Sequence, residues 1–351
     1  MKISVSVGSA YYDGERWPDV VEFVKAAERL GVDTIWSAEA WGMEAVSSLG
    51  YLAAVTDRVR LGPGIMQISA RTPAMTAMTA LSMSQLSGDR FVLGLGVSGP
   101  QVVEGLHGAS FARPLGRLRE YIEIVRMMLR GERVTYEGEH FVLPRPGGEG
   151  KPLRSSIRPR PDLPIYLATL GPRSLELTGE LADGWLGTSF IPEHAEVLLD
   201  PIRRGAQRAG RTLDDIDVQV NAQLAVGEDV EALVDRYRQT MAFTLGGMGS
   251  ATTNFYNSAF SRAGWADVAD EVRRRWVAGD KAGAARAVPE ELVLSAYLVG
   301  TEEMVRDRIR AHVDAGIDGV RIGPVGRTAA EQIERLEQSV DLIRTTTAGH
   351  P

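Results

Sequence analysis

Short runs of β-branched and aliphatic residues alternate with longer helix-like segments along the whole chain, and this alternation constrains the fold more than any other feature. Such a pattern builds a parallel sheet from successive strand and helix units. Eight runs predict strands: Ile3–Val7, Thr34–Ser37, Val59–Ile65, Phe91–Leu95, Ile165–Ala168, Gly184–Gly187, Val218–Val226 and Gly319–Ile322.

Helices between these runs carry matching end signals. A proline stands just inside the start and a glycine just past the end of three of them: Pro18–Leu30 before Gly31, Pro73–Leu86 before Gly88, and Pro114–Leu129 before Gly131. This asymmetry is favoured at helix termini. An open, doubly wound sheet shows the same alternation, since periodicity does not separate open from closed parallel sheets. We predict the closed form, an α/β fold with a (β/α)8 TIM barrel, as one domain over residues 1–351.

Two stretches interrupt the alternation and predict insertions, at about 134–163 and at about 228–292. In the first, Val134–Leu143 alternates apolar and polar residues around Gly138, which predicts a hairpin before a loop rich in proline, glycine and arginine. The second is mostly helical in pattern and contains a turn-like glycine cluster at Gly246–Ser250. Long insertions in barrels usually lie among the loops that carry function, so both are candidates for covering a substrate site.

The composition excludes several kinds of protein. The chain has no cysteine, so it has no disulfide, thiolate nucleophile or cysteine-bound metal, and any redox chemistry requires a bound cofactor. A net charge of -7 argues against nucleic acid as the main partner and favours a small molecule. The five histidines lack the spacing of a metal site, which argues against a metal-dependent hydrolase.

The N-terminal residues and the hydropathy predict a cytoplasmic protein. Met1–Val7 is a strand-like run without the basic and apolar segments of a signal peptide. No stretch reaches the roughly 18 consecutive apolar residues of a membrane-spanning helix, so we expect no membrane partner. Hydrophobic residues make up 44% and charged residues 24% of the chain, which indicates an ordinary folded protein.

The segments that follow the predicted strands carry the candidate chemistry, because active sites of such barrels form at the strand C-terminal ends. Four of them read WSAEAWG (36–42), GPGIMQISARTP (62–73), LGLGVSGPQVVEGLHG (93–108) and ATLGPRS (168–174). Their glycines let the backbone approach a ligand closely. The turn Gly171–Ser174 opens a helix, so its amides and Arg173 predict a phosphate site, although this sequence is equally a good helix start.

Five segments in order resemble the F420-dependent oxidoreductases of the bacterial luciferase-like superfamily, especially the branch that contains methylenetetrahydromethanopterin reductase. They are GVDTIWSAEAWG, RVRLGPGIMQISARTPAMTAMTA, LSGDRFVLGLGVSGPQVVEGLHG, GPRSLELTGELADGW and GGMGSATTNFYN. The resemblance spans nearly the whole chain. It implies a luciferase-like TIM barrel, a homo-oligomer such as a homodimer, and hydride transfer between the deazaflavin coenzyme F420 and a small organic substrate.

The resemblance also implies a cofactor site. In this family a non-proline cis peptide at the end of the third strand supports the deazaflavin ring, and the matching pair here is Gly64 and Ile65. The residues that would border the ring and its ribityl chain are Met66, Gln67, Gly96, Val97, Ser98 and Gly99. The turn that would hold the cofactor phosphate is Leu170, Gly171, Pro172, Arg173 and Ser174.

The catalytic groups that the resemblance implies are fewer. Glu39 falls where relatives carry a histidine or an acid near the reacting face of the cofactor, so it is a candidate either to transfer the proton or only to orient the cofactor. Trp41 is a candidate wall of the substrate pocket, and a packing role suits it equally.

The chain also departs from the family at positions that matter for catalysis. Certain relatives place acidic residues where this chain has Ser6 and Gly99, so the role of those acids does not transfer. Glu104 and His107, further along the same loop as Gly99, are the alternative proton carriers. Arg71 and Arg113 are candidates for the acidic cofactor tail, although solvated arginines are more common.

Two other functions compete with F420-dependent hydride transfer. The first keeps the fold and changes the cofactor, as an FMN-dependent luciferase-like monooxygenase. The second is a cofactor-binding protein without turnover, which the missing acids support and the intact loop segments oppose.

Overall fold

A computed structural model describes residues 1–8, 16–250, 253–323 and 325–349 of the chain. By internal contacts the chain forms two compact units. Unit 1 consists of Met1–Val5, Thr169–Glu180 and Trp185–Pro351, and unit 2 of Ser6–Ala168 and Leu181–Gly184. Neither unit is therefore one continuous segment.

The main sheet has nine strands in the order β3-β2-β1-β13-β10-β9-β8-β5-β4. Their bounds are β1 Lys2–Val7, β2 Thr34–Ser37, β3 Arg60–Pro63, β4 Met66–Gln67, β5 Leu93–Gly96, β8 Ile165–Leu167, β9 Gly184–Gly187, β10 Asp217–Asn221 and β13 Gly319–Ile322. Neighbours follow chain order, without the reversal of a doubly wound sheet.

The two ends of this sheet meet. β3 lies within the predicted strand Val59–Ile65, and β4 follows directly after that strand. Both contact the β5 segment: Leu61 of β3 bridges Phe91, and Met66 of β4 pairs with Leu95. Counting β3 and β4 as one strand reduces the nine strands to the eight of a closed (β/α)8 barrel. The predicted fold class is confirmed, and the open sheet is excluded.

One predicted strand is wrong in extent. The run Val218–Val226 forms two strands, β10 and β11 (Leu224–Val226), rather than one. β10 ends where the amide of Ala222 bonds the Arg321 carbonyl of β13, at 2.9 Å. β11 then pairs in parallel with β12 (Leu298–Gly300), a strand that the sequence pattern did not predict. The apolar run around β12 continues directly from a helix, so hydropathy does not mark the boundary.

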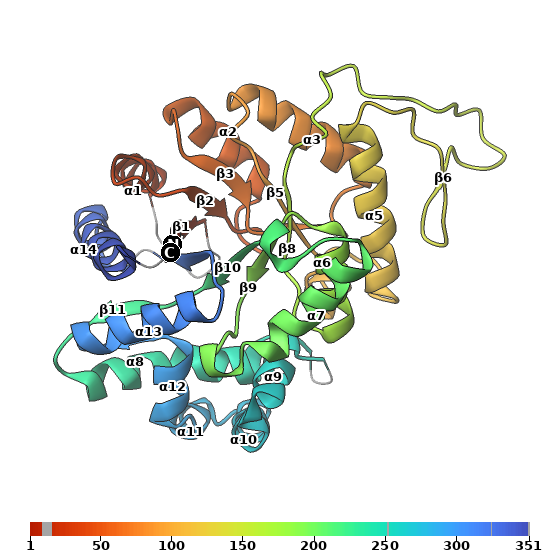
Figure 1. The fold of residues 1–351 in the computed structure, drawn as a ribbon. Helices are drawn as coiled ribbons and strands as arrows, with labels where there is room; N and C mark the ends of the chain where they lie inside the picture. The colour runs from red at the N-terminus through yellow and green to blue at the C-terminus, as the bar shows by residue number, and fades with distance from the viewer. Residues whose placement is uncertain (9–15, 251–252, 324, 350–351) are drawn as a thin grey trace. The chain divides into compact units, whose positions relative to one another are not determined.

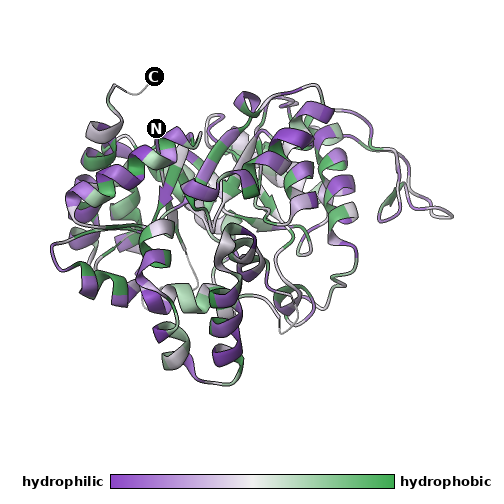
Figure 2. Ribbon diagram, turned by 60° about the horizontal axis from the view of Figure 1, so that its bottom comes forward, coloured by the Kyte–Doolittle hydropathy of each residue, from purple (hydrophilic) through white to green (hydrophobic). Residues whose placement is uncertain are grey.

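Two helices begin and end at the predicted residues, α3 Pro73–Leu86 and α5 Pro114–Leu129, and α1 Trp17–Arg29 is shifted by one residue at each end. The other helices outside the second insertion are α2 Ala45–Val55, α4 Pro100–Val103, α6 Pro172–Leu181, α7 Glu196–Arg208, α13 Glu302–Asp314 and α14 Ala329–Thr347, with short 3-10 turns at Pro192–His194 and Leu213–Asp215. Figure 2 shows that the longer helices carry both hydrophobic and hydrophilic residues, as expected for helices that cover a buried sheet. In the described residues, no helix is both long and apolar enough to cross a membrane.

The first interruption contains the predicted hairpin, with β6 (Tyr136–Glu137) antiparallel to β7 (Val142–Leu143). Figure 1 places it on the outer side of α5. Glu120 of α5 holds the hairpin loop by accepting hydrogen bonds from the amides of Glu139, His140 and Phe141, at 2.8 to 2.9 Å. A Cβ at Gly138 would lie 2.4 Å from the Glu120 carboxylate, so the predicted turn glycine is required for this approach.

The second interruption is mostly helical, as predicted. It contains α8 Val230–Ala242, α9 Phe255–Phe260, α10 Ala266–Val277, α11 Lys281–Arg286 and α12 Glu290–Ala296, with π-helical turns at Phe243–Gly247 and Ser261–Trp265. Figure 1 shows α8 to α12 gathered together in unit 1. Their apolar side chains form a core that includes Ile191, just after β9. Gly246 and Gly247 belong to a π-helix, so the predicted turn begins only after them.

Candidate functional site

Glu39, just after β2, is the centre of a hydrogen-bonded cluster in unit 2. Its carboxylate forms a two-pronged ion pair with Arg71, with Oε1 to Nη1 at 2.6 Å and Oε2 to Nη2 at 2.8 Å. Oε1 also accepts the Gln67 amide at 3.2 Å, and Oε2 accepts the Ala45 amide at 3.1 Å. Only 7% of the Glu39 side chain and 17% of the Arg71 side chain are exposed. The carboxylate therefore joins β4, the start of α2 and the segment before α3.

Glu44 extends this cluster at the start of α2. Its carboxylate caps the helix by accepting the amides of Val46 and Ser47, at 2.9 and 2.6 Å, and lies 3.3 Å from Arg71. Burial acts to raise the pKa of Glu44, but hydrogen bonds from Ser47 and Val46 and the charge of Arg71 outweigh it and lower the pKa. Burial acts to lower the pKa of Arg71, but Glu39 and Glu44 raise it. Arg71, a candidate for the cofactor tail, is thus occupied by two carboxylates.

The peptide bond between Gly64 and Ile65 is cis, as the resemblance implied. It lies between β3 and β4, and the Gly64 amide bonds the Ser37 carbonyl at 2.7 Å. A Cβ on Gly96 of β5 would lie only 2.9 Å from Cγ1 of Ile65. The structure therefore brings Ile65 directly against Gly96, while Gly64 lies against Trp36. The contact of these residues with a cofactor stays a prediction.

Met66 and Gln67, which follow the cis bond, are almost completely buried. The Gln67 amide nitrogen donates to the Ala40 carbonyl at 3.1 Å. Its Oε1 is buried and, within the described residues, has no hydrogen-bond partner. A buried acceptor without a partner is costly, so this atom is a candidate ligand contact.

The loop after β5 remains accessible at three predicted positions. Val97, Ser98 and Gly99 are each half-buried. Ser98 has a left-handed backbone, with φ of 60°, and Gly99 precedes the first residue of α4. This accessible backbone suits a ligand that contacts main-chain groups.

The remaining unit 2 candidates are more exposed. Glu104 and His107 lie at the surface after α4, and the Glu104 carboxylate accepts the amide of Phe111 at 3.1 Å. In the described part of the chain, neither side chain is hydrogen-bonded to the Glu39 cluster. The Trp41 side chain is 55% exposed. Arg113 is exposed and forms an ion pair with Glu139.

The predicted phosphate turn, Leu170–Ser174, belongs to unit 1 and joins β8 to α6. The Ser174 hydroxyl donates to the Gly171 carbonyl at 2.8 Å, which fixes the turn, while Pro172 and Arg173 are exposed. The first amides of a helix have no partner within the helix and attract anions. The turn thus lies at a helix start, and phosphate binding there stays a prediction.

Arg262, in the second insertion, is a residue near this turn that the sequence did not indicate. Its guanidinium donates to the Leu170 carbonyl at 2.7 Å. Burial lowers its pKa. No local motif marks Arg262, because its position depends on how the insertion packs within unit 1.

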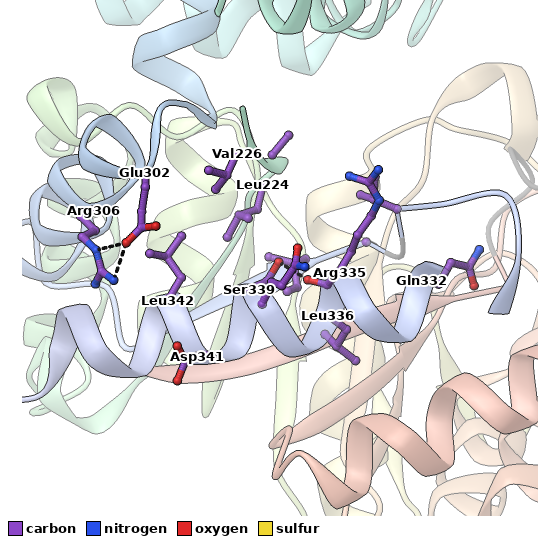
Figure 3. Close-up of a pocket in the computed structure, with 15 residues that line it drawn as sticks. Leu224, Val226, Glu302, Arg306, Gln332, Arg335, Leu336, Ser339, Asp341 and Leu342 are labelled. Carbon is purple, nitrogen blue, oxygen red and sulfur yellow. Dashed lines mark hydrogen bonds and ion pairs between the residues drawn. The ribbon is translucent and has the colours of Figure 1, made fainter. Parts of the chain in front are cut away.

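A cavity of about 290 Å³ in unit 1 contains none of the predicted site residues. It lies between β11, the end of β13, and helices α13 and α14. Figure 3 shows Leu224 and Val226 facing α14, with the Glu302–Arg306 ion pair at one end. Among the described residues, no group of three or more histidines, aspartates and glutamates is arranged to hold a metal ion.

Comparison with known proteins places the chain in a family. The model of the luciferase-like monooxygenase family matches residues 1–319. The chain belongs to this family. It is 40% identical, over 96% of its length and 98% of the relative, to the Mycobacterium tuberculosis protein named "Putative coenzyme F420-dependent oxidoreductase Rv3520c". It is 30% identical, over 95% of its length and 98% of the relative, to 5,10-methylenetetrahydromethanopterin reductase of Archaeoglobus fulgidus.

Solved structures confirm the fold. The coenzyme F420-dependent tetrahydromethanopterin reductase from Methanopyrus kandleri superposes with a TM-score of 0.78 at 24% identity, covering 96% of this chain and 97% of that one. An F420-dependent secondary alcohol dehydrogenase with an F420-acetone adduct superposes with a TM-score of 0.76 at 18% identity, covering 98% and 99%. The luciferase-like barrel is thus established for this member of the family.

Proposed function

We propose that this protein is an F420-dependent oxidoreductase that transfers a hydride between coenzyme F420 and a small organic substrate. The observation that carries the proposal is the 40% identity, over 96% of the chain, to a relative named for coenzyme F420. The relative from Archaeoglobus fulgidus, a methylenetetrahydromethanopterin reductase, supports the same reaction class over 95% of the chain.

The residues of unit 2 fit a flat ring system. Gly96 leaves no room for a side chain beside Ile65, and the Val97–Gly99 backbone is accessible. Gln67 holds an acceptor that finds no partner among the described residues. When bound, F420 carries the hydride at C5 of its deazaflavin ring. Ile65 and Gly96 would support this ring, and Met66, Gln67 and Val97–Gly99 would border it. In unit 1, Leu170–Ser174 would hold the phosphate, assisted by Arg262.

Glu39 acts in this proposal as a positioning residue. Its carboxylate accepts four hydrogen bonds, two of them from Arg71. A carboxylate in a two-pronged pair with a guanidinium serves as an acceptor rather than a proton donor. Its role is to fix the loop after β2 and the strand that follows the cis peptide. His107 and Glu104 of the β5 loop, with Trp41 as a pocket wall, are the proposed groups on the substrate side.

A paired titration tests the cofactor. F420 and FMN are titrated separately into equal concentrations of the full chain, with cofactor fluorescence as the readout. We expect F420 to bind at least about tenfold more tightly, a difference of about 1.4 kcal/mol. Tighter binding of FMN would instead support the monooxygenase, and binding of neither would refute both enzymatic proposals.

Arg173→Glu tests the phosphate turn in the same titration. Reversing charge beside a phosphate should raise the F420 dissociation constant about tenfold or more at low salt, and less at high salt because salt screens the repulsion. Arg203→Glu, an exposed arginine on α7, is the matched control and should bind F420 normally. Unchanged affinity of Arg173→Glu at low salt would remove the turn from the cofactor site.

A further inference from the structure

Gln67, the last residue of β4 in unit 2, presents its side chain on the face of the strand that is turned away from α3. Met66, just before it, contacts α3, where the Thr76 hydroxyl donates to the Met66 sulfur at 3.8 Å. Successive side chains of a strand point to opposite faces, so the Gln67 side chain points away from that helix. Only 1% of Gln67 is exposed, so its amide group is enclosed on this face.

The same face carries the residues proposed to support the cofactor ring. Gln67 is the register partner of Gly96 on β5, and paired residues of neighbouring strands project to the same side. A Cβ on Gly96 would lie 2.9 Å from Cγ1 of Ile65. The half-buried backbone of Val97–Gly99 continues directly from Gly96. A ligand that lies against Ile65 and Gly96 is therefore beside the Gln67 amide.

The loop after β2 fixes the orientation of the Gln67 amide. Its Nε2 lies 3.1 Å from the carbonyl oxygen of Ala40 and 3.4 Å from that of Glu39. A carbonyl oxygen only accepts hydrogen bonds, so the atom beside both must be the nitrogen, and the amide cannot be turned over. The backbone amide of Gln67 also donates to the Glu39 carboxylate, at 3.2 Å. Oε1 of Gln67 is thus a fixed acceptor.

This acceptor receives no donor from the residues that the structure describes. Oε1 is enclosed, and none of those residues hydrogen-bonds to it. An amide oxygen that loses water on burial and gains no partner costs free energy. Because Nε2 is directed at two carbonyl oxygens, the side chain cannot rotate to find a donor without losing both bonds. Oε1 of Gln67 therefore requires a donor from a ligand.

We propose that Gln67 Oε1 accepts a hydrogen bond from the imide N–H of the deazaflavin ring, and so determines which edge of the ring enters the site. This rests on the proposed function, because F420 is taken as the ligand. The imide edge carries an N–H between two carbonyl groups, so it requires an acceptor with donors beside it. Gln67 supplies the acceptor. The accessible Val97–Gly99 backbone, which follows the register partner of Gln67, supplies main-chain donors.

F420 methylated at the imide nitrogen tests this contact, because the methyl group removes the donor. F420 and the methylated derivative are titrated separately into the full chain without substrate, with cofactor fluorescence as the readout. We expect methylation to weaken binding to the wild type at least about tenfold, and Gln67→Met to weaken binding of F420 itself at least about fivefold. Methylation should weaken binding to Gln67→Met by less than about twofold, because the acceptor is already absent.

This difference between the two proteins separates a hydrogen bond from a structural role. If Gln67→Met only disturbed the loop after β2, methylation would weaken binding to the variant as much as to the wild type, and this result would overturn the proposal. Gln85→Met, which removes an exposed glutamine of α3, is the matched control. It should bind F420 and the methylated derivative as the wild type does.

The same titrations distinguish a failure of this inference from a failure of the proposed function. A wild type that binds F420 and the methylated derivative equally well would refute the Gln67 contact while F420 stands, and would assign Oε1 to the substrate or to water. FMN carries the same imide group, so if FMN binds more tightly, the test is repeated with FMN and its methylated derivative, and only the choice of F420 fails. A wild type that binds neither cofactor would refute both proposals.

Discussion

At the residue scale, the pair of Glu39 and Arg71 connects segments of unit 2 that are 32 residues apart. Both side chains are mostly buried, so their mutual charge is screened less than that of surface pairs. Removing one partner leaves the charge of the other buried and only partly compensated. The resulting loss of folding free energy is larger than the net contribution of the intact pair.

We expect Glu39→Gln to destabilise the protein by about 2 to 3 kcal/mol. This is less than for a fully buried pair, because Arg71 retains its ion pair with Glu44. Arg71→Lys should behave similarly, since lysine cannot form the fork. Urea unfolding measures the free energies, with the exposed Glu132→Gln as an unaffected control.

If Glu39 only positions the loop, both variants lower activity without changing the shape of the pH profile. If Glu39→Gln alone lost the rise or the fall on one side of the plot of activity against pH, Glu39 would be the proton carrier.

His312 of α13 is the second residue whose environment has a measurable consequence. It is 1% exposed, and its ring lies 5.6 Å from that of Phe190. Its Nδ1 is 2.8 Å from the Arg308 carbonyl oxygen and must carry the hydrogen, since a carbonyl only accepts. Burial lowers the pKa of His312 from 6.5 to about 4, although the Arg308 carbonyl and Glu193 oppose this shift.

Acid should therefore destabilise the folded chain through His312. Between pH 6.5 and about 4 the unfolded chain binds a proton that the folded chain does not, so stability is complete above pH 6.5 and falls as the pH approaches 4. The loss from this group should reach about 3 kcal/mol. Urea unfolding at several pH values should show a smaller loss for His312→Gln, while His107→Gln follows the wild type. If the free energy of unfolding changed with pH by the same amount in all three proteins, His312 would not be the group responsible.

At the scale of elements, α6 and α7 of unit 1 approach through two glycines. A Cβ on Gly179 would lie 2.0 Å from the Ile202 carbonyl oxygen, and one on Gly205 would lie 1.8 Å from the Glu176 carbonyl oxygen. Backbone therefore packs on backbone. Because α6 begins at the predicted phosphate turn, this packing sets where the turn lies.

We expect Gly205→Ala to lower the free energy of unfolding by about 2 kcal/mol or more, because the added methyl group forces the helices apart. The F420 dissociation constant of Gly205→Ala should also rise, because the shifted helix displaces the turn. Gly50→Ala on α2 is the matched control, since no atom lies within 4 Å of the added Cβ. It should stabilise the helix by up to about 1 kcal/mol. Calorimetry and cofactor titration measure both effects, and an unaffected Gly205→Ala would contradict the close packing.

At the scale of the whole molecule, unit 2 presents apolar side chains to solvent on two neighbouring helices. Tyr51 of α2 is 52% exposed, and Met75 and Met78 of α3 are 51% and 46% exposed. Exposed apolar groups that gather on one surface often mark an interface between proteins. We propose that α2 and α3 form the contact of a homodimer.

Met78→Glu should convert this dimer to a monomer, because the contact would bury one unpaired charge from each copy. Sedimentation velocity over a range of concentrations measures the change. Val277→Glu, an exposed apolar position on α10 of unit 1, is the control and should leave the dimer intact. A wild type that sediments as a monomer would refute the proposed interface.

The order of strands and helices was predictable from the sequence because it depends on local periodicity and local end signals. The helices Pro73–Leu86 and Pro114–Leu129 match to the residue, since a proline start and a glycine stop act within one turn. The cis peptide at Gly64 and Ile65 was implied by family resemblance, and no pattern of hydropathy indicates it.

Only the tertiary structure decided which distant groups meet. The departure of β11 from the barrel depends on β12, whose register with β11 is set by packing far along the chain. The pairing of both Glu39 oxygens with Arg71, 32 residues away, appears only in the folded structure. A periodic pattern specifies which face of an element is buried, but the charges and hydrogen bonds on that face depend on the elements packed against it.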